Sequence, residues 1–496
     1  MSRKLPIFYS ALLLTAVNLL LRLVGTSFQV YLSSRIGAAG IGLLQLVMSV
    51  GGLAMVAGMA GVRTATMYLT AEELGRKHPE NTRRVLSACF LYSILCSGSL
   101  SGILYGFAPE LAEVWIGDPR TADPLRLYAA ILPVICLCGV MSGYFTAANR
   151  IGTLAVIEVL EQLCSMAVTM TALAFWAGSD IGRACQCIIL GSGAGACLTL
   201  FCLVFLRMRE HTDRCPGENP VARRLLRTAV PLALADVLKS GINTLENLMV
   251  PKRLKHNTSV ADPLAAFGTV SGMVFPVLMF PACILYALAE LLIPELARCN
   301  AAGSSHRITY LVRRSLKVAM LYGLLFGGLM FLLAEPLCRK LYHNDAAAHY
   351  LQLYAILIPM LYCDAITDAM TKGLGQQTAC VRYNILSSGL DVVFLFLLLP
   401  RFGMDGYFAS FLITHLINFI LSLRRLLKIS RESLPFHIPA LSCSAALAAV
   451  CGASRIQGEI GQILAYIALF GSLLSMFRVI GREDLAWLGG LLNTKK

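Results

Sequence analysis

Long apolar stretches recur along almost the whole of this 496-residue chain, and they constrain its fold more than any other feature. About 20 consecutive apolar residues can cross a bilayer as a helix, which satisfies every backbone polar group within the segment. Hydrophobic residues make up 57% of the chain and charged residues 14%, whereas soluble proteins carry about 25% charged residues. The sequence therefore predicts an all-α, polytopic membrane protein.

Fourteen such stretches predict about 14 transmembrane helices. The first is too long for the apolar region of a cleavable signal peptide, so we expect it to remain. Pro276 and Pro281 predict a kink in the eighth, because proline removes a backbone hydrogen bond. The stretches cover residues 7–32, 39–62, 85–107, 127–148, 154–178, 184–206, 228–250, 264–291, 315–334, 351–371, 378–399, 404–423, 436–454 and 459–477.

A nine-residue motif occurs twice, at Leu125–Pro133 and at Leu351–Pro359, with an offset of 226 positions. Each copy begins an apolar stretch. Internal repeats of this kind are typical of secondary transporters, whose halves move around a shared central site. We therefore expect two pseudo-symmetric six-helix lobes, an N-lobe over residues 1–215 and a C-lobe over 216–434, followed by two C-terminal helices and a tail over 435–496.

Lysine and arginine predict the orientation of these helices, because basic loops are retained on the cytoplasmic side. With the N-terminus inside, the inner segments hold 29 Lys and Arg and the outer segments hold 11. This bias predicts cytoplasmic termini in a cell inner or plasma membrane. A basic inner face accounts for the net charge of +14 without a nucleic-acid partner, and it predicts contact with anionic membrane lipids.

The sequence gives no sign of metal, redox or ATP chemistry. Most of the 17 cysteines lie singly within apolar stretches, where they act as small hydrophobic residues. No His-x-x-x-His pair and no phosphate-binding loop of the form G-x-x-x-x-G-K-[ST] is present. We therefore expect a protein that is not an enzyme and has no cofactor and no metal site.

Polar side chains within the apolar stretches are the candidate ligands. A charge at the bilayer centre costs at least about 2.5–3.5 kcal/mol and usually faces a wet cavity. In the first stretch Asn18, Arg22 and Gln29 share one helix face. Arg22 has no acid within its own turn, so it needs a partner from another helix or a ligand. We expect all three to bind substrate.

The seventh stretch carries a second polar face. Asp236, Lys239, Asn243 and Glu246 recur there at helical spacing, in the place of the C-lobe that corresponds to the first stretch. We expect Lys239 and Asn243 to bind substrate and the two acids to line the cavity. In an alternative interpretation, Asp236 and Lys239 are only a local ion pair between residues i and i+3.

Further acids lie in other stretches. Glu161 lies in the fifth stretch, and Asp364 and Asp368 lie in the tenth. Such acids are candidates for binding H⁺ or Na⁺ during transport. The sequence leaves open whether an ion, the substrate gradient or the membrane potential drives the cycle.

Several short motifs resemble those of a known family. They are Arg22–Gly25, Ile36–Gly42, Ala60–Arg63, Pro231–Leu232, Val250–Leu254, Gly268–Gly272, Leu292–Leu296 and Ala334–Leu337. Through these motifs, and over about residues 10 to 480, the chain is similar to the stage V sporulation protein B-like branch of the multidrug, oligosaccharidyl-lipid and polysaccharide (MATE-like) exporter superfamily.

The resemblance implies a twelve-helix core with two extra helices that could form a groove for a lipid tail. It also implies outward flipping of a polyprenyl-pyrophosphate-linked saccharide or peptidoglycan precursor. Arg22 matches an arginine of the first helix in related lipid II flippases. The chain departs from their pattern at Phe28 and has no Lys or Arg between Ala261 and Glu290, so Lys239 is the candidate second cation.

Three functions therefore stay open. The first is a lipid-linked saccharide flippase. The second is an H⁺- or Na⁺-coupled multidrug exporter of the same fold, whose cationic substrates Arg22 and Lys239 would repel. The third is a scaffold that does not transport and that gathers cell-wall or spore-envelope assembly enzymes.

Overall fold

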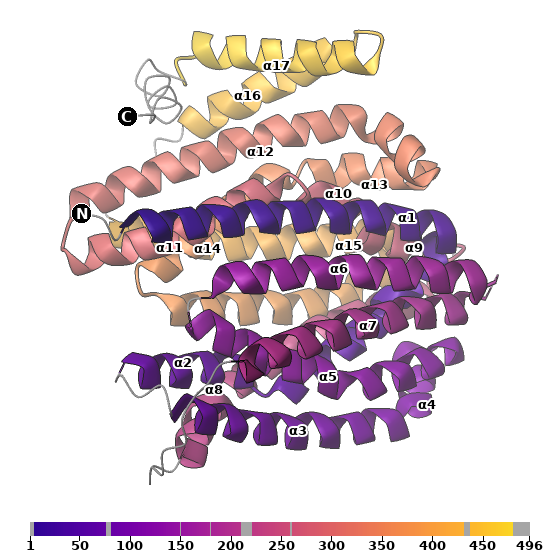
Figure 1. The fold of residues 1–496 in the computed structure, drawn as a ribbon. Coiled ribbons are helices and arrows are strands. Elements are labelled where there is room, and N and C mark those ends of the chain that lie inside the picture. The colour runs from indigo at the N-terminus through magenta and orange to yellow at the C-terminus, as the bar shows by residue number, and fades with distance from the viewer. Residues whose placement is uncertain are drawn as a thin grey trace. The chain divides into compact units, whose positions relative to one another are not determined.

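Helices make up the regular structure of this chain (Figure 1). The computed structural model describes residues 4–75, 81–148, 150–178, 180–209, 221–257, 260–430 and 437–479. No strand occurs in these ranges. The prediction of an all-α chain is confirmed.

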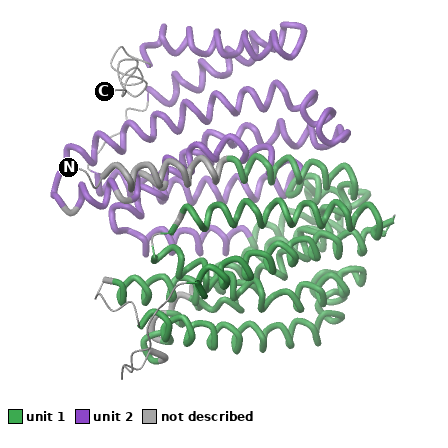
Figure 2. The backbone as a smooth tube through the Cα atoms, in the orientation of Figure 1, with its two compact units in different colours: residues 1–272, 392–404 green, residues 273–391, 405–496 purple. Residues whose placement is uncertain are grey.

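The chain forms two compact units (Figure 2). Unit 1 comprises residues 1–272 and 392–404, and unit 2 comprises residues 273–391 and 405–496. The helices that begin in unit 1 are α1 (Lys4–Met59), α2 (Val62–Gly75), α3 (Thr82–Gly106), α4 (Ala108–Glu110), η2 (Leu111–Ile116), η3 (Pro119–Thr121), α5 (Ala122–Ala147), α6 (Ile151–Phe175), α7 (Ile181–Met208), α8 (Val221–Leu254), α9 (Pro263–Gly268) and η4 (Thr269–Val274).

The helices that begin in unit 2 are α10 (Phe275–Met279), α11 (Ala282–Ala301), α12 (Ser305–Tyr342), α13 (Asp345–Ala355), α14 (Ile358–Gly373), α15 (Gln377–Ser430), α16 (His437–Ala453) and α17 (Glu459–Met476). The middle of α15, residues 392–404, belongs to unit 1. The lobe boundaries predicted after residues 215 and 434 come from the sequence repeat, whereas the two units are defined by contacts between residues. The lobe boundaries stay predictions.

Two glycines divide the longest helices. Helices α1 and α15 contain 56 and 54 residues, more than twice the length of about 20 residues that a bilayer requires. The backbone is not helical at Gly37 (φ 69°) in α1 and at Gly403 (φ 59°) in α15. A side chain is disfavoured at such angles, whereas glycine adopts them without steric cost. Each kink separates two of the apolar stretches that the sequence predicts.

The expected proline kink is confirmed. The segment Pro263–Met279 and the segment Ala282–Ala289 meet at an angle of 64°, and Pro281 lies between them. A second bend of 55° separates α13 from α14 just before Pro359. Its sequence counterpart, Pro133, lies within the uninterrupted helix α5. The repeated motif therefore has different local geometry in its two copies.

Many helices are long and apolar enough to cross a membrane. Within the described ranges, eight helices meet that test, or ten if each bent pair is one span. In both totals, each of the kinked helices α1 and α15 is counted as a single helix. The multi-pass membrane fold is confirmed, and the number of fourteen spans stays a prediction.

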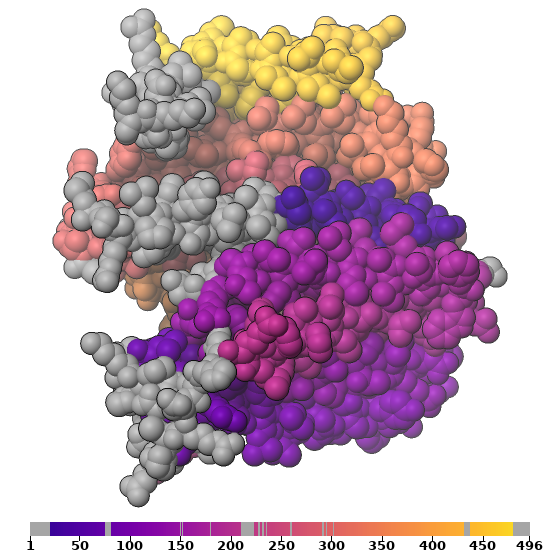
Figure 3. All heavy atoms as spheres, in the orientation of Figure 1, coloured from indigo at the N-terminus to yellow at the C-terminus, as the bar shows by residue number. Residues whose placement is uncertain are grey.

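Each unit has its own packed interior. In unit 1, glycines of α7 let α6 approach closely: a Cβ atom on Gly191 would lie 2.0 Å from the Thr169 Oγ1 atom. The space-filling view shows α6 and α7 side by side on one face of this unit (Figure 3). In unit 2, helices α16 and α17 pack on α12, where the buried Tyr466 hydroxyl donates a hydrogen bond to the Leu324 carbonyl at 2.8 Å. The first of these contacts holds α6, which carries the candidate residue Glu161.

Candidate functional site

The candidate residues of α1 lie in unit 1. Arg22 is exposed and Gln29 is half-buried. The Gln29 Nε2 atom donates a hydrogen bond to the Gly272 carbonyl at 3.1 Å. Asn18 belongs to α1, but its side chain lies outside the described residues. In this conformation Gln29 therefore connects α1 to η4, and Arg22 lies at the surface of α1.

Helix α8 presents most of its predicted polar face to the surface. Asp236, Lys239 and Asn243 are exposed, and Glu246 is half-buried. No ion pair joins Asp236 to Lys239 in the part of the chain that the structure describes. The alternative interpretation as a local ion pair is therefore not the arrangement seen here, although the roles of both residues stay predictions.

The opposite side of α8 explains why these residues are exposed. The Thr244 hydroxyl donates to the Ser49 carbonyl at 3.0 Å, and the Asn247 amide donates to the Ser49 hydroxyl at 3.1 Å. A helix turns about 100° per residue, so Lys239 and Asn243 lie about 100–140° around the helix from Thr244. The contact with α1 thus leaves their face uncovered within unit 1.

Glu161 takes part in a contact between helices. Its Oε2 atom accepts a hydrogen bond from the Thr199 hydroxyl at 2.7 Å, which joins α6 to α7. One carboxylate oxygen of Glu161, a predicted cavity acid, is therefore hydrogen-bonded to a neighbouring helix.

A pair of carboxyl and amide groups lies within unit 2. The Asp364 Oδ2 atom accepts a hydrogen bond from the Asn418 Nδ2 atom at 3.2 Å. The Oδ1 atoms of both residues are buried and have no hydrogen-bond partner within the described ranges. Asp368, one turn further along α14, forms an ion pair with Lys372 at 2.5 Å. Asp364 and Asn418 therefore offer two uncompensated acceptor oxygens, while Asp368 already has a cation.

Sequence reasoning missed Asn418 because the partners are 54 residues apart and lie on different helices. It also gave Asp391 no role in the site. The Asp391 Oδ1 atom accepts hydrogen bonds from the Ser410 hydroxyl at 2.6 Å and from the Thr414 hydroxyl at 3.3 Å. The only sequence signal for such pairs is a polar residue in each of two apolar stretches, which does not say which residues meet.

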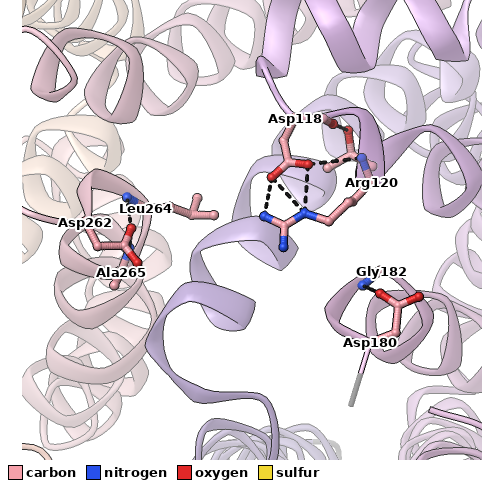
Figure 4. A network of polar contacts seen from close by, with 8 residues as sticks. Asp118, Arg120, Asp180, Gly182, Asp262, Leu264 and Ala265 are labelled. Atoms are coloured by element: carbon pink, nitrogen blue, oxygen red, sulfur yellow. Dashed lines mark hydrogen bonds and ion pairs between the residues drawn. The ribbon is translucent and has the colours of Figure 1, made fainter. Parts of the chain in front are cut away.

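A further polar cluster lies at one end of the unit 1 helices (Figure 4). Asp118 accepts hydrogen bonds from the Arg120 side chain at 2.6 and 3.0 Å. These bonds hold the pKa of the Asp118 carboxyl below its ordinary value. Asp180 and Asp262 accept hydrogen bonds from the first backbone N–H groups of α7 and α9. Such caps stabilise helix starts, and they give this cluster a structural role.

Two family models match overlapping parts of the chain. The polysaccharide biosynthesis protein family matches residues 8–300, and the MatE family matches residues 231–397. The chain is 22% identical to stage V sporulation protein B of Bacillus subtilis (strain 168) over 96% of each chain. It is 25% identical to the probable lipid II flippase MurJ of Rhizobium meliloti (strain 1021) over 51% of this chain and 47% of that protein.

Solved structures share the fold. The lipid II flippase MurJ in an inward closed conformation matches with a TM-score of 0.70 and 14% identity, covering 94% of this chain and 98% of that chain. An inward-facing multidrug transporter of the MATE family matches with a TM-score of 0.65 and 12% identity, covering 84% and 96%. These relatives are transporters rather than enzymes. The chain belongs to the polysaccharide biosynthesis protein family, and it shares its fold with solved transporters of the MOP superfamily.

Proposed function

We propose that this chain is a flippase that moves a polyprenyl-pyrophosphate-linked saccharide or cell-wall precursor from the inner to the outer leaflet of the plasma membrane. The observation that carries the proposal is the exposure of two cations, Arg22 and Lys239, within α1 and α8 of a chain of this family. Both termini lie in the cytoplasm in this proposal. The name of one relative, the probable lipid II flippase MurJ, supports the same class of substrate.

The two cations suit a pyrophosphate group. A guanidinium binds phosphate oxygens through paired hydrogen bonds, and an ammonium adds a compact charge. Asn18, Gln29 and Asn243 supply amide groups for the remaining oxygens or for the saccharide. Gln29 must first release the Gly272 carbonyl that it contacts here. The polyprenyl tail stays in lipid while the two lobes alternate in access.

Ion coupling is assigned to the acids. A bound proton or Na⁺ would compensate the buried Oδ1 atoms of Asp364 and Asn418, because an unpaired polar atom away from water is costly. Asp368, Asp236, Glu246 and Glu161 are the further candidates. The buried pair of Asp364 and Asn418 also favours the second candidate function, a cation-coupled multidrug exporter. The two functions differ in substrate, since a cationic drug is repelled by Arg22 and Lys239.

The deciding experiment measures lipid-linked saccharide on the outer leaflet of cells that depend on this chain. Arg22→Ala is expected to reduce that signal at least about tenfold, since a charge-assisted hydrogen bond contributes about 1.5–3 kcal/mol. Arg35→Ala is the matched control, because Arg35 is an exposed arginine of the same helix α1 that lies beyond the end of the first apolar stretch. Full activity of the Arg22→Ala chain, at wild-type abundance in the membrane, would exclude this site.

A further inference from the structure

Helix α12 is much longer than a membrane span. Its 38 residues extend about 57 Å at 1.5 Å per residue, whereas the hydrocarbon core is about 30 Å thick. The apolar stretch that the sequence predicts begins only at residue 315. If residues 315–334 span the hydrocarbon as predicted, the first three turns of α12, residues 305–314, extend beyond it into the head-group region.

One face of this extension is basic. His306, Tyr310, Arg313 and Lys317 recur at spacings of three and four residues, with Arg314 at the edge of the same face. The segment 305–317 contains no Asp or Glu. The Arg314 guanidinium donates a hydrogen bond to the Tyr310 hydroxyl at 2.9 Å. Tyrosine and basic residues together are typical of helix segments at the membrane–water interface.

The opposite face of the extension is fixed against unit 2. Ile308, Val312 and Leu316 are buried. The Thr309 hydroxyl donates to the Ser430 carbonyl at 2.8 Å, and Arg307 forms an ion pair with Glu295 at 2.5 Å. The basic face is therefore held pointing away from the packed helices.

The contact with Ser430 places the end of a second basic segment beside α12. It joins the last turn of α15 to the second turn of α12. Arg424 and Lys428 lie one turn apart on α15, and both are exposed. The segment 424–430 also lacks Asp and Glu. We use the name α12 basic patch for the basic and tyrosine residues of these two adjoining helix ends: His306, Tyr310, Arg313, Arg314, Lys317, Arg424 and Lys428.

We propose that the α12 basic patch binds the anionic head groups of phospholipids in the adjacent leaflet. Clusters of four to eight Lys and Arg beside a membrane helix attract anionic lipid, and the attraction falls off within about 10 Å in 0.1 M salt. The patch meets that description, because five Lys and Arg lie where α12 leaves the hydrocarbon. Its partner is a lipid surface rather than the transported substrate.

The test uses the purified full-length chain in a zwitterionic detergent and a fluorescent phosphatidylglycerol as the probe. The variant Arg313→Gln/Arg424→Gln/Lys428→Gln removes three exposed charges from the patch. The control Arg339→Gln/Lys340→Gln/Arg455→Gln removes three exposed charges from the opposite end of α12 and from the loop after α16. We expect the patch variant to raise the Kd for phosphatidylglycerol at least about tenfold and the control to change it less than about twofold.

Two further conditions identify the ligand. In 0.5 M NaCl the difference between wild type and patch variant should disappear, because salt screens exposed charges. Millimolar inorganic phosphate should not compete with phosphatidylglycerol. Equal binding by wild type and patch variant overturns the proposal, and so does competition by phosphate. If the triple variant does not fold, the single variants Arg313→Glu and Arg424→Glu replace it, and unchanged binding by both overturns the proposal. Flipping is not measured, so the outcome is independent of the proposed function.

Discussion

The Arg224 guanidinium lies 2.9 Å from a carboxylate oxygen of Glu73 and 2.5 Å from one of Glu72. Glu73 is 3% exposed, and its second oxygen accepts a hydrogen bond from the Asn81 amide at 3.2 Å. This cluster joins α2 to the first turns of α8. A buried carboxylate requires a counter-charge, so Arg224 holds these two helices together at that end of α8.

Replacing Arg224 should destabilise the protein. Arg224→Ala leaves Glu73 buried beside Glu72 without their shared cation, and we expect a loss of at least about 1.5 kcal/mol of unfolding free energy. Thermal unfolding of the purified chain in detergent measures the effect as a lower Tm. Arg223→Ala is the control, because Arg223 is the exposed neighbour on the same turn. An equal Tm for the two variants would show that the cluster contributes nothing.

The chemistry of the first cation is testable by a conservative change. Arg22→Lys should restore only part of the outer-leaflet signal that Arg22→Ala loses, because an ammonium cannot make the bidentate contact of a guanidinium with phosphate. The double variant Asp236→Asn/Lys239→Gln should lose activity as well, since Lys239 is the second cation. Wild-type activity of that double variant would show that neither Asp236 nor Lys239 is needed to bind the substrate.

The buried pair in unit 2 predicts cation-dependent stability. Choline chloride is replaced stepwise by NaCl at constant ionic strength. If Na⁺ binds between Asp364 and Asn418, this exchange should raise the Tm of the wild-type chain. Asp364→Asn should remove that increase. Asp368→Asn is the matched control, because Asp368 is already paired with Lys372. The same Na⁺ response in wild type and Asp364→Asn would contradict a Na⁺ site there.

The contact between Asp118 and Arg120 predicts a loss of stability in acid. The native pKa of Asp118 is lowered by Arg120, whereas the unfolded value is about 3.9. The carboxylate therefore contributes its full stability above about pH 3.9 and loses it as the pH falls through the lower native pKa. The Tm difference between wild type and Asp118→Asn should be largest near neutral pH and shrink below about pH 4. A Tm difference between the two chains that grows as the pH falls would contradict a lowered native pKa for Asp118.

Cysteine labelling tests the orientation. Ser305→Cys and Ala261→Cys introduce thiols at exposed positions that the prediction places in an inner and an outer loop. Native Cys299 is a poor reporter at 4% exposure, and Cys215 lies outside the described residues. A membrane-impermeant thiol reagent should label Ala261→Cys in intact cells and Ser305→Cys only after permeabilisation. Labelling of Ser305→Cys from outside would overturn the helix count.

The local features of the fold could be predicted from the sequence. The apolar stretches mark the membrane helices because hydrophobic length is a property of consecutive residues. The kink at Pro276 and Pro281 followed from the missing backbone donor of proline, and the bend of 64° confirms it. The helical spacing of Asp236, Lys239 and Asn243 likewise predicted one shared face. Each inference needed only neighbours along the chain.

The tertiary structure alone decided which polar groups meet. The Gln29 side chain donates a hydrogen bond to a carbonyl 243 positions away, and Arg224 donates one to Glu73, 151 positions away. Asp364 accepts one from Asn418, 54 positions away. Such pairs depend on which helix faces lie against one another, and periodicity within one helix does not contain that information. A polar residue in an apolar stretch therefore indicated that a partner or ligand is needed, because an unpaired polar group away from water is costly. Packing of the helices determined what that partner is.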